Sequence, residues 1–306
     1  MISSWRLTAG TPYDVPLPTT GSEDHVPHAS PDRITELADA MAAADRDRAV
    51  QEVQTRYRAE LVRRWDIAPG ARVLEVGCGQ GDMTAVLADA VGPHGHVLAV
   101  DVADPSYGAP VTVGDSAARL AAGPLGPRID FRFGFDVLDE EATSDFADGA
   151  FDHVVLAHCS WYFASAEQLT RTLARVRPWA RTLCFAEWDL TPRSADRIPH
   201  LLAVLAQGQA FAYGHGEDAN VRVPMSRDAL RALLGPAGWQ ATAAETVETT
   251  GLQDADWEIA IFRNLYATLD PGSAVARALR PTLDALDPLA LPRGNATLDA
   301  YTLTAR

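Results

Sequence analysis

The stretch Val73–Asp82, with the sequence VLEVGCGQGD, decides the fold of this chain of 306 residues. Its first residues are mostly apolar, as in a buried strand, and glycines follow at positions 77, 79 and 81. Glycines in such a turn admit positive φ angles and let a ligand lie directly against the backbone. A helix beginning near Asp82 would point its unpaired amides and its positive dipole end at that ligand. The stretch therefore predicts a strand, a glycine-rich turn and a helix at a ligand site.

Strands and helices alternate on the carboxyl side of this turn. Continuous apolar runs such as VLAV and HVVLA are typical of strands buried on both faces of a parallel sheet. We expect strands at 72–76, 96–100, 129–133, 153–157 and 182–187, and helices at 83–91, 116–122 and 166–176. This alternation predicts an α/β fold with a doubly wound sheet and helices on both faces.

The flanking segments follow other patterns. Residues 1–29 are rich in Pro, Gly, Ser and Thr and predict an irregular arm. Ser30 is the expected N-cap of a helix, and apolar residues spaced by three or four predict a second helix over 50–65. After residue 189 we expect helices at 196–213, 227–234 and 254–287, a turn at 214–218, and strands at 240–249 and 296–304. The predicted organisation is an arm and helical cap at 1–66, and a main domain at 67–306 with helical insertions at about 191–225 and 252–293.

Composition excludes several classes of protein. The net charge is −15, with 41 acidic and 26 basic residues, and every basic residue is an arginine without clustering. Such a chain is expected to be repelled by nucleic acids and anionic membranes. Three cysteines without a CxxC pair argue against a disulfide scaffold or zinc site. With no signal peptide or long apolar run, a cytoplasmic protein with a small-molecule substrate is predicted, and its oligomeric state is left open.

The acids beside the glycines favour one ligand over another. A dinucleotide turn, G-x-G-x-x-G, would need glycine at the position of Asp82. Glu75 would repel a pyrophosphate but would attract a sulfonium or ammonium group. Asp101 and Asp136 follow the next two strands, where one could bind ribose hydroxyls and the other the adenine amine, since ligands bind at the carboxyl ends of such strands. S-adenosylmethionine is therefore favoured over NAD.

At this point the chain resembles the class I (Rossmann-like) S-adenosylmethionine-dependent methyltransferases. The resemblance rests on IAPGARVLEVGCGQGD, VLAVDVA, FDVLDE, GAFDHVVLAHCSWYF and RTLCFAEWDL, and it is strong over about 66–190. It implies a seven-stranded, mostly parallel sheet that ends in an antiparallel strand pair. It also implies S-adenosylmethionine as cofactor, held by Glu75, Gly77, Cys78, Gly79, Gly81, Asp101, Val102, Asp136, Val137 and His158.

The methyl acceptor is expected beside the loops after the fourth and fifth strands. His158 could be the general base, because imidazole exchanges protons near neutral pH, or it could hydrogen-bond the cofactor or a backbone carbonyl. Glu187 could orient an amine, act as a base, or cap its loop. Four aromatic residues could bind a flat or cationic substrate, or pack in the core: Trp161, Tyr162, Trp188 and Tyr213.

The predicted activity is methyl transfer to O, N or C of a small molecule such as a natural-product intermediate. Two alternatives remain at this stage, an NAD(P)-dependent oxidoreductase and a non-catalytic S-adenosylmethionine-binding protein. His158, Glu187 and Asp189 also suggest a metal-dependent O-methyltransferase. They do not match the acid-acid-Asn set expected for such a site, so no metal is predicted.

Overall fold

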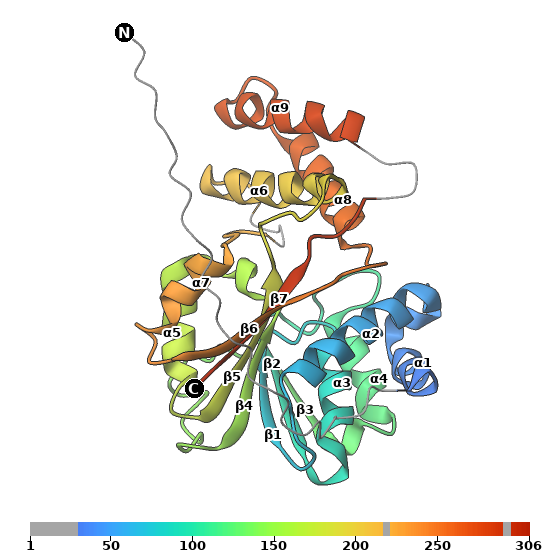
Figure 1. The fold of residues 1–306 in the computed structure, drawn as a ribbon, viewed down its shortest axis with the longest axis vertical. Helices are drawn as coiled ribbons and strands as arrows, with labels where there is room; N and C mark the ends of the chain where they lie inside the picture. Colours follow the sequence, from blue (N-terminus) through green and yellow to red (C-terminus); the bar gives the residue numbers. More distant parts are fainter. Residues whose placement is uncertain (1–29, 217–220, 290–294) are drawn as a thin grey trace, which may run out of the picture.

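The structure is a computed structural model that describes residues 30–216, 221–289 and 295–306. Seven strands form one sheet at its centre (Figure 1). The strands are β1 (Arg72–Val76), β2 (His96–Asp101), β3 (Ile129–Phe133), β4 (Phe151–Ala157), β5 (Ala180–Trp188), β6 (Ala241–Val247) and β7 (Ala300–Ala305). Their order is β3-β2-β1-β4-β5-β7-β6. The first five strands pair in parallel, and β7 runs antiparallel to both β5 and β6. The predicted fold class is confirmed.

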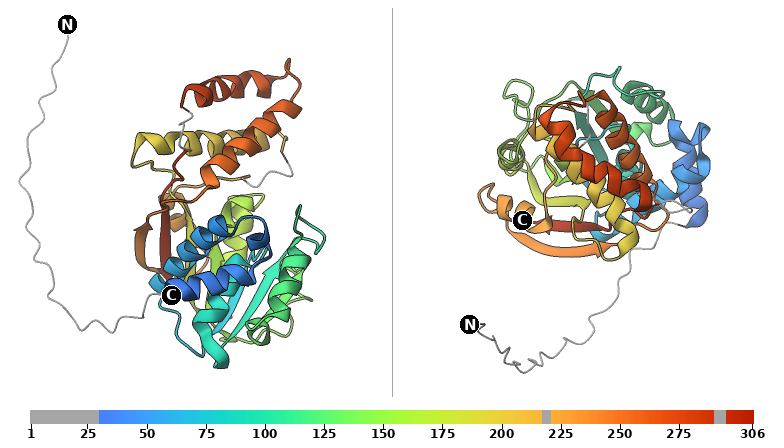
Figure 2. Two further views of the ribbon diagram at one scale, coloured as in Figure 1. Left: turned by 90° about the vertical axis from the view of Figure 1, so that its right-hand side faces the viewer. Right: turned by 90° about the horizontal axis from the view of Figure 1, so that it is seen from above.

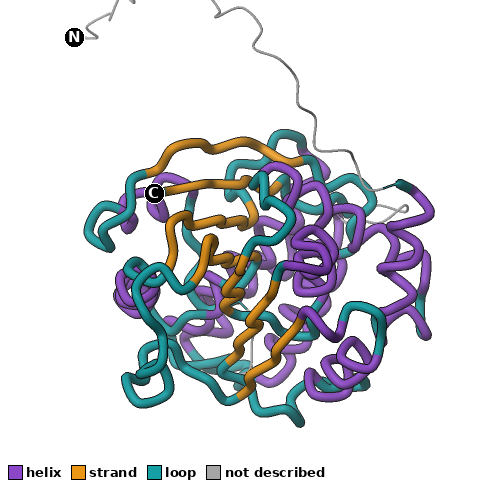
Figure 3. Tube along the Cα trace, turned by 90° about the horizontal axis from the view of Figure 1, so that it is seen from below, coloured by secondary structure: helices purple, strands orange, loops and turns teal. Residues whose placement is uncertain are grey.

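The helices are α1 (Pro31–Ala40), α2 (Arg48–Arg64), α3 (Asp82–Val91), α4 (Val113–Ala122), α5 (Ala166–Val176), α6 (Ile198–Ala212), α7 (Arg227–Leu234), α8 (Asp254–Thr268) and α9 (Ala274–Leu289). In Figure 1, α1 to α4 lie to the right of the sheet and α5 and α7 to the left. The view from below shows the strands between these two groups of helices (Figure 3). Both faces of the sheet are therefore covered, as its apolar strands require.

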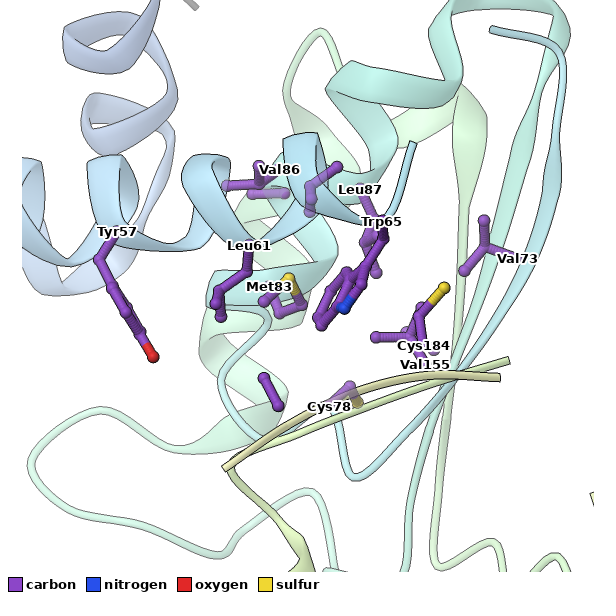
Figure 4. Close-up of a cluster of buried hydrophobic side chains, with 14 of the residues drawn as sticks. Tyr57, Leu61, Trp65, Val73, Cys78, Met83, Val86, Leu87, Val155 and Cys184 are labelled. Carbon is purple, nitrogen blue, oxygen red and sulfur yellow. The ribbon is translucent and has the colours of Figure 1, made fainter. Parts of the chain in front are cut away.

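Alternating side chains of the strands build two cores. Val73 and Val155 face α2 and α3, whereas Leu74 and Val154 face α5 and α7, and all four are fully buried. On the first face, Tyr57 and Leu61 of α2 and its C-cap Trp65 point toward the sheet (Figure 4). The predicted helix over 50–65 is thus part of the main core.

A third core belongs to a cap made of α6, α8 and α9. Phe262 of α8 and Leu279 of α9 are completely buried in it, together with Ala203, Ala206 and Ala210 of α6. The helix α6 follows β5, whereas α8 and α9 lie between β6 and β7, yet they pack side by side (Figure 2). Two segments far apart in the sequence therefore form one cap above the carboxyl ends of the parallel strands (Figure 1).

The observed limits of most elements differ little from the predicted ones, but the predicted helical stretch 254–287 is divided into α8 and α9 by residues 269–273. The last strand begins at Ala300 and not at residue 296, because the preceding residues serve the cap: Thr297 Oγ1 accepts a hydrogen bond from the Ala255 amide at 3.2 Å. Gly214 and Gly216 have φ angles of 79° and 75°, as a turn requires. The predicted arm at 1–29 and the remainder of the predicted turn, 217–218, lie outside the described residues.

The start of α5 is stabilised by a reciprocal pair of side-chain caps. Ser165 Oγ accepts from the Gln168 amide at 3.1 Å, and Gln168 Oε1 accepts from the Ala164 amide at 2.9 Å. We expect Ser165→Ala to lower the free energy of unfolding by about 1 kcal/mol, the usual value of such a cap. Urea denaturation of this variant, beside Ser144→Ala in a surface turn, measures the effect; equal stability of Ser165→Ala and the unchanged chain would contradict it.

Candidate functional site

The glycine turn after β1 has the backbone that its sequence predicts. Gly77, Gly79 and Gly81 all have positive φ, at 82°, 51° and 84°. A Cβ at Gly77 would lie 2.7 Å from the Cβ of Cys159, so this position is closed to larger residues. A Cβ at Gly79 would meet nothing within 4 Å, which leaves that backbone open for a ligand. The turn is thus tight on one side and accessible on the other.

A cavity of about 400 Å³ lies against this turn. Among the residues predicted to hold the cofactor, those that line the cavity are Glu75, Gly77, Cys78, Gly79, Asp101, Val102, Asp136, Val137 and His158. Gly81 is the exception. It is the N-cap of α3, and a Cβ there would lie 2.8 Å from Leu120 and 3.3 Å from Phe131. Gly81 therefore packs closely against the neighbouring elements, and its contact with the cofactor stays a prediction.

Glu75 is a buried carboxyl group at the wall of the cavity. Only 2% of its surface is exposed, and its Oε2 accepts a hydrogen bond from Thr84 Oγ1 at 2.6 Å. Burial raises the pKa of Glu75 to about 8, and the negative charge of Asp101 adds to the rise. A positively charged ligand group in the cavity would favour its ionised form.

Asp101 and Asp136 hold the loops that follow β2 and β3. Asp101 accepts amide hydrogen bonds from Gly79 at 2.8 Å and from Ala103 at 2.9 Å. Asp136 accepts one from the Leu138 amide at 2.8 Å. Each carboxylate therefore fixes its own loop while it faces the cavity, where its remaining lone pairs can accept hydrogen bonds from hydroxyl or amine groups.

His158 stands at the end of β4 and connects two functional side chains. Its Nδ1 lies 3.2 Å from Glu187 Oε1, and its Nε2 lies 2.7 Å from the hydroxyl of Tyr57 on α2. The Glu187 carboxylate is 2% exposed and also accepts from the Ser160 amide, the Ser160 hydroxyl and the Trp188 amide. With Glu187 so fixed, Nδ1 carries the hydrogen, and Nε2 accepts from Tyr57.

His158 is held in this position by its neighbours. Its φ angle is 51°, a left-handed conformation that is uncommon outside glycine and occurs at functional sites. Its ring centroid lies 4.0 Å from that of Trp188, and the Tyr57 ring stacks on the same Trp188 at 6.1 Å. Burial raises the pKa of Tyr57 well above its usual value, so its hydroxyl keeps its proton.

The four predicted substrate-binding aromatics divide into two pairs. Tyr162 and Trp188 line the cavity. Trp161 does not, because its ring is 2% exposed and packs in the core that includes α2 and α3. Tyr213 caps the end of α6 and exposes 56% of its surface. Trp161 and Tyr213 are therefore corrected to a core residue and a surface residue.

Several polar residues on the cavity wall have no counterpart in the predicted site, among them residues of two helices. Tyr57, Gln54 and Arg58 come from α2, and Asp254 and Glu258 come from α8 of the cap. In the sequence, Tyr57 is one of the residues spaced by three or four that form the apolar face of its helix. The two acids of α8 lie in a helix whose sequence mixes polar and apolar residues. No local signal therefore distinguishes them from acids that face solvent.

Two further classes of site are absent from the described part of the chain. No group of three or more His, Cys, Asp or Glu side chains is placed to hold a metal ion there. None of the described helices has the length and apolar character to cross a membrane.

Comparison with known proteins gives these features a family. A family model described as a methyltransferase domain matches residues 73–182. Among solved structures, this chain is similar to a cyclopropane-fatty-acyl-phospholipid synthase-like protein from Lactobacillus casei ATCC 334, with 36% sequence identity. That match has a TM-score of 0.81 and covers 90% of this chain and 99% of the other. It therefore extends over the cap as well as the sheet.

Two curated relatives match over shorter segments. The methyltransferase phomM' of Diaporthe leptostromiformis is 34% identical over 163 residues, which is 46% of this chain and 41% of the relative. The nocamycin O-methyltransferase of Saccharothrix syringae is 32% identical over 147 residues, covering 45% of this chain and 48% of the relative. This chain thus spans less than half the length of these relatives. The sheet order, the glycine turn and these matches agree: the chain belongs to the class I S-adenosylmethionine-dependent methyltransferases, whose methyl donor is S-adenosylmethionine.

Proposed function

We propose that this chain transfers the methyl group of S-adenosylmethionine to a small molecule held in the same cavity. The observation that carries the proposal is the continuity of that cavity. One wall is the glycine turn with Asp101, another holds His158 and Tyr57, and the cap contributes Glu258. Donor and acceptor sites therefore share one cavity, as an in-line displacement requires.

The donor would lie along the carboxyl edge of the sheet. Asp101 would accept hydrogen bonds from the ribose hydroxyls, and Asp136 would accept one from the adenine amine. The methionine part would lie over Gly79, with its ammonium group near Glu75 and its carboxylate near Arg58. Both of these residues line the cavity, and the charge of Arg58 reaches Glu75.

His158, Tyr57 and Glu187 would remove a proton from the acceptor. The Tyr57 oxygen takes the proton of the acceptor while its own proton passes over 2.7 Å to His158 Nε2. Glu187, 3.2 Å from Nδ1, stabilises the resulting imidazolium. The electron pair freed on the acceptor forms a bond to the methyl carbon, the carbon–sulfur bond breaks, and S-adenosylhomocysteine remains.

The size of the cavity and two relatives support a small acceptor. A volume of about 400 Å³ is within the usual range for small-molecule sites. The relatives include a nocamycin O-methyltransferase and a demethylmenaquinone methyltransferase from Symbiobacterium thermophilum, whose names specify small molecules. The net charge of −15 also disfavours a nucleic-acid substrate.

Methyl transfer can be tested directly. The full chain is incubated with methyl-labelled S-adenosylmethionine and a panel of small alcohols, phenols, amines and activated carbon acids, and labelled products are followed by mass spectrometry. We expect a labelled product with stoichiometric S-adenosylhomocysteine from at least one acceptor, and loss of product in the Asp101→Ala variant. Donor binding without any product across the panel would instead support a non-catalytic binding protein.

Donor binding is expected to depend on pH through Glu75. Without ligand, this carboxyl has a pKa of about 8, so it is protonated at pH 6 to 7. A bound ammonium favours the ionised form, so binding lowers this pKa and releases a proton. The affinity for S-adenosylhomocysteine should therefore rise from pH 6 to about 8 and then level off.

Calorimetry across this pH range measures the effect. The Glu75→Gln variant cannot ionise and should give a flatter profile, whereas Glu140→Gln, at an exposed site, should keep the original slope. An affinity of the unchanged chain that is constant between pH 6 and 8 would rule out this role of Glu75.

A further inference from the structure

The cap brings two carboxylates to the wall of the cavity. Asp254 and Glu258 lie one turn apart on α8, and both line the cavity. Asp254 Oδ2 accepts a hydrogen bond from Gln54 Nε2 at 2.9 Å, which is a neutral donor. Within the described residues, neither acid forms an ion pair with an arginine or histidine. These two carboxylates bring negative charge to the cap side of the cavity, whose wall also includes Arg58 and Arg222.

Of the two carboxylates, Glu258 has the less complete set of hydrogen-bond partners. It is 9% exposed, and its Oε2 accepts from Gln207 Nε2 at 2.7 Å. Its Oε1 receives no hydrogen bond from the described residues, and Gln207 Oε1 is itself buried without a partner. Burial raises the pKa of Glu258 to about 7. The hydrogen bond from Gln207 lowers this pKa, whereas the charges of Asp254 and Glu187 raise it further. A buried carboxylate is costly unless it is paired, so Glu258 lacks a positive partner.

The other buried acids of the site do not share this deficiency. Glu187 is as deeply buried, but it accepts from three donors besides His158. Glu75 accepts from Thr84 and stands beside the glycine turn, where the cationic donor is proposed to bind. Glu258 instead comes from the cap, on the acceptor side, so that its missing partner should be the acceptor.

Aromatic rings line the cavity together with these carboxylates. Tyr57, Tyr162 and Trp188 all face it. Burial raises the pKa of Tyr57, the charge of Arg58 lowers it, and the charges of Asp254 and Glu187 raise it, which places these groups near its ring. Ring faces attract cations, most strongly in surroundings that exclude water. Aromatic rings and carboxylates around one small space are the combination that binds an organic ammonium ion.

We infer that the acceptor is a small amine, bound as its ammonium ion by Glu258, Asp254 and these rings, and methylated on nitrogen. The inference rests on the proposed function. The ammonium gives one proton to the Tyr57 oxygen as the Tyr57 proton moves to His158. The freed lone pair of nitrogen forms a bond to the methyl carbon, and the electrons of the carbon–sulfur bond stay on sulfur. The products are an N-methylammonium ion and S-adenosylhomocysteine.

Matched ligands test the charge requirement independently of catalysis. The full chain, saturated with S-adenosylhomocysteine, is titrated with 2-phenylethylamine, 2-phenylethanol and phenylacetate, and with the aliphatic set dimethylaminoethanol, 3-methylbutanol and 3-methylbutyrate. In at least one set we expect the amine to bind about tenfold or more tightly than its neutral and anionic counterparts. Incubation with S-adenosylmethionine should then methylate that amine on nitrogen.

Isosteric variants assign the preference to the cap. Glu258→Gln and Asp254→Asn should each weaken amine binding about tenfold, as for loss of a charge-assisted contact. Both should leave the affinity for S-adenosylhomocysteine unchanged, as should the exposed control Glu140→Gln, which should also retain amine binding. Equal or tighter binding of the alcohols or acids, or amine binding that is unaffected by both variants, would overturn the inference. Absence of S-adenosylhomocysteine binding would instead contradict the proposed function itself.

Discussion

Replacing Tyr57 by phenylalanine is expected to lower the rate of methyl transfer about a hundredfold, within the range of general acid–base contributions. The ring remains stacked on Trp188, 6.1 Å away, but the hydroxyl that lies 2.7 Å from His158 Nε2 is lost. The affinity for S-adenosylhomocysteine should change little, because this hydroxyl faces His158. The measurement is the turnover number with the best acceptor of the panel, together with donor affinity by calorimetry.

The split between turnover and acceptor affinity distinguishes a proton relay from a structural role of Tyr57. Loss of the relay should lower the turnover number and leave the KM of the acceptor nearly unchanged. Tyr266→Phe is the matched control, because it removes a hydroxyl that donates to the Ala276 carbonyl within the cap. A Tyr57→Phe variant with full turnover would show that the relay is wrong.

Gly77→Ala is expected to abolish donor binding and to destabilise the fold. A non-glycine residue at a φ of 82° costs roughly 1–3 kcal/mol. The added Cβ would also lie 2.7 Å from the Cβ of Cys159, so the turn or the loop after β4 must move. Because His158 is the neighbour of Cys159, this movement would disturb the acceptor side as well.

Gly70→Ala separates the two effects. Gly70 has a φ of 84°, but a Cβ there meets nothing within 4 Å, and the residue does not line the cavity. We expect Gly70→Ala to lose only the folding stability that the strained backbone costs and to retain its affinity for the donor. Denaturant unfolding and calorimetry on both variants measure the difference; donor binding by Gly77→Ala as tight as by Gly70→Ala would contradict the close approach of Cys159.

The donor side of the site could be predicted because its signals are local in the sequence. The glycine turn directly follows β1, and Asp101 and Asp136 follow the next two strands, so the topology of a parallel sheet brings them to one edge. The same rule placed His158 and Glu187 at the ends of β4 and β5. Here the sequence pattern and the geometry of the sheet determine the positions together.

The acceptor side could not be predicted in the same way, because it depends on packing between distant segments. Tyr57 reaches His158 only because α2 packs on the sheet at one particular rotation. Glu258 enters the cavity only because α8 packs against α6 from a separate insertion. In contrast, Trp161 follows a strand end like a site residue, but its ring turns into the core. Neither helical period nor spacing contains this information.

The central claim is that the edge formed by the glycine turn and Asp101 binds S-adenosylmethionine and not a dinucleotide. Calorimetric titration of the full chain with S-adenosylhomocysteine and with NAD⁺, repeated on Asp101→Ala, tests it most directly. The account predicts saturable binding of S-adenosylhomocysteine, its loss in Asp101→Ala, and no binding of NAD⁺. Saturable binding of NAD⁺ without binding of S-adenosylhomocysteine would contradict it.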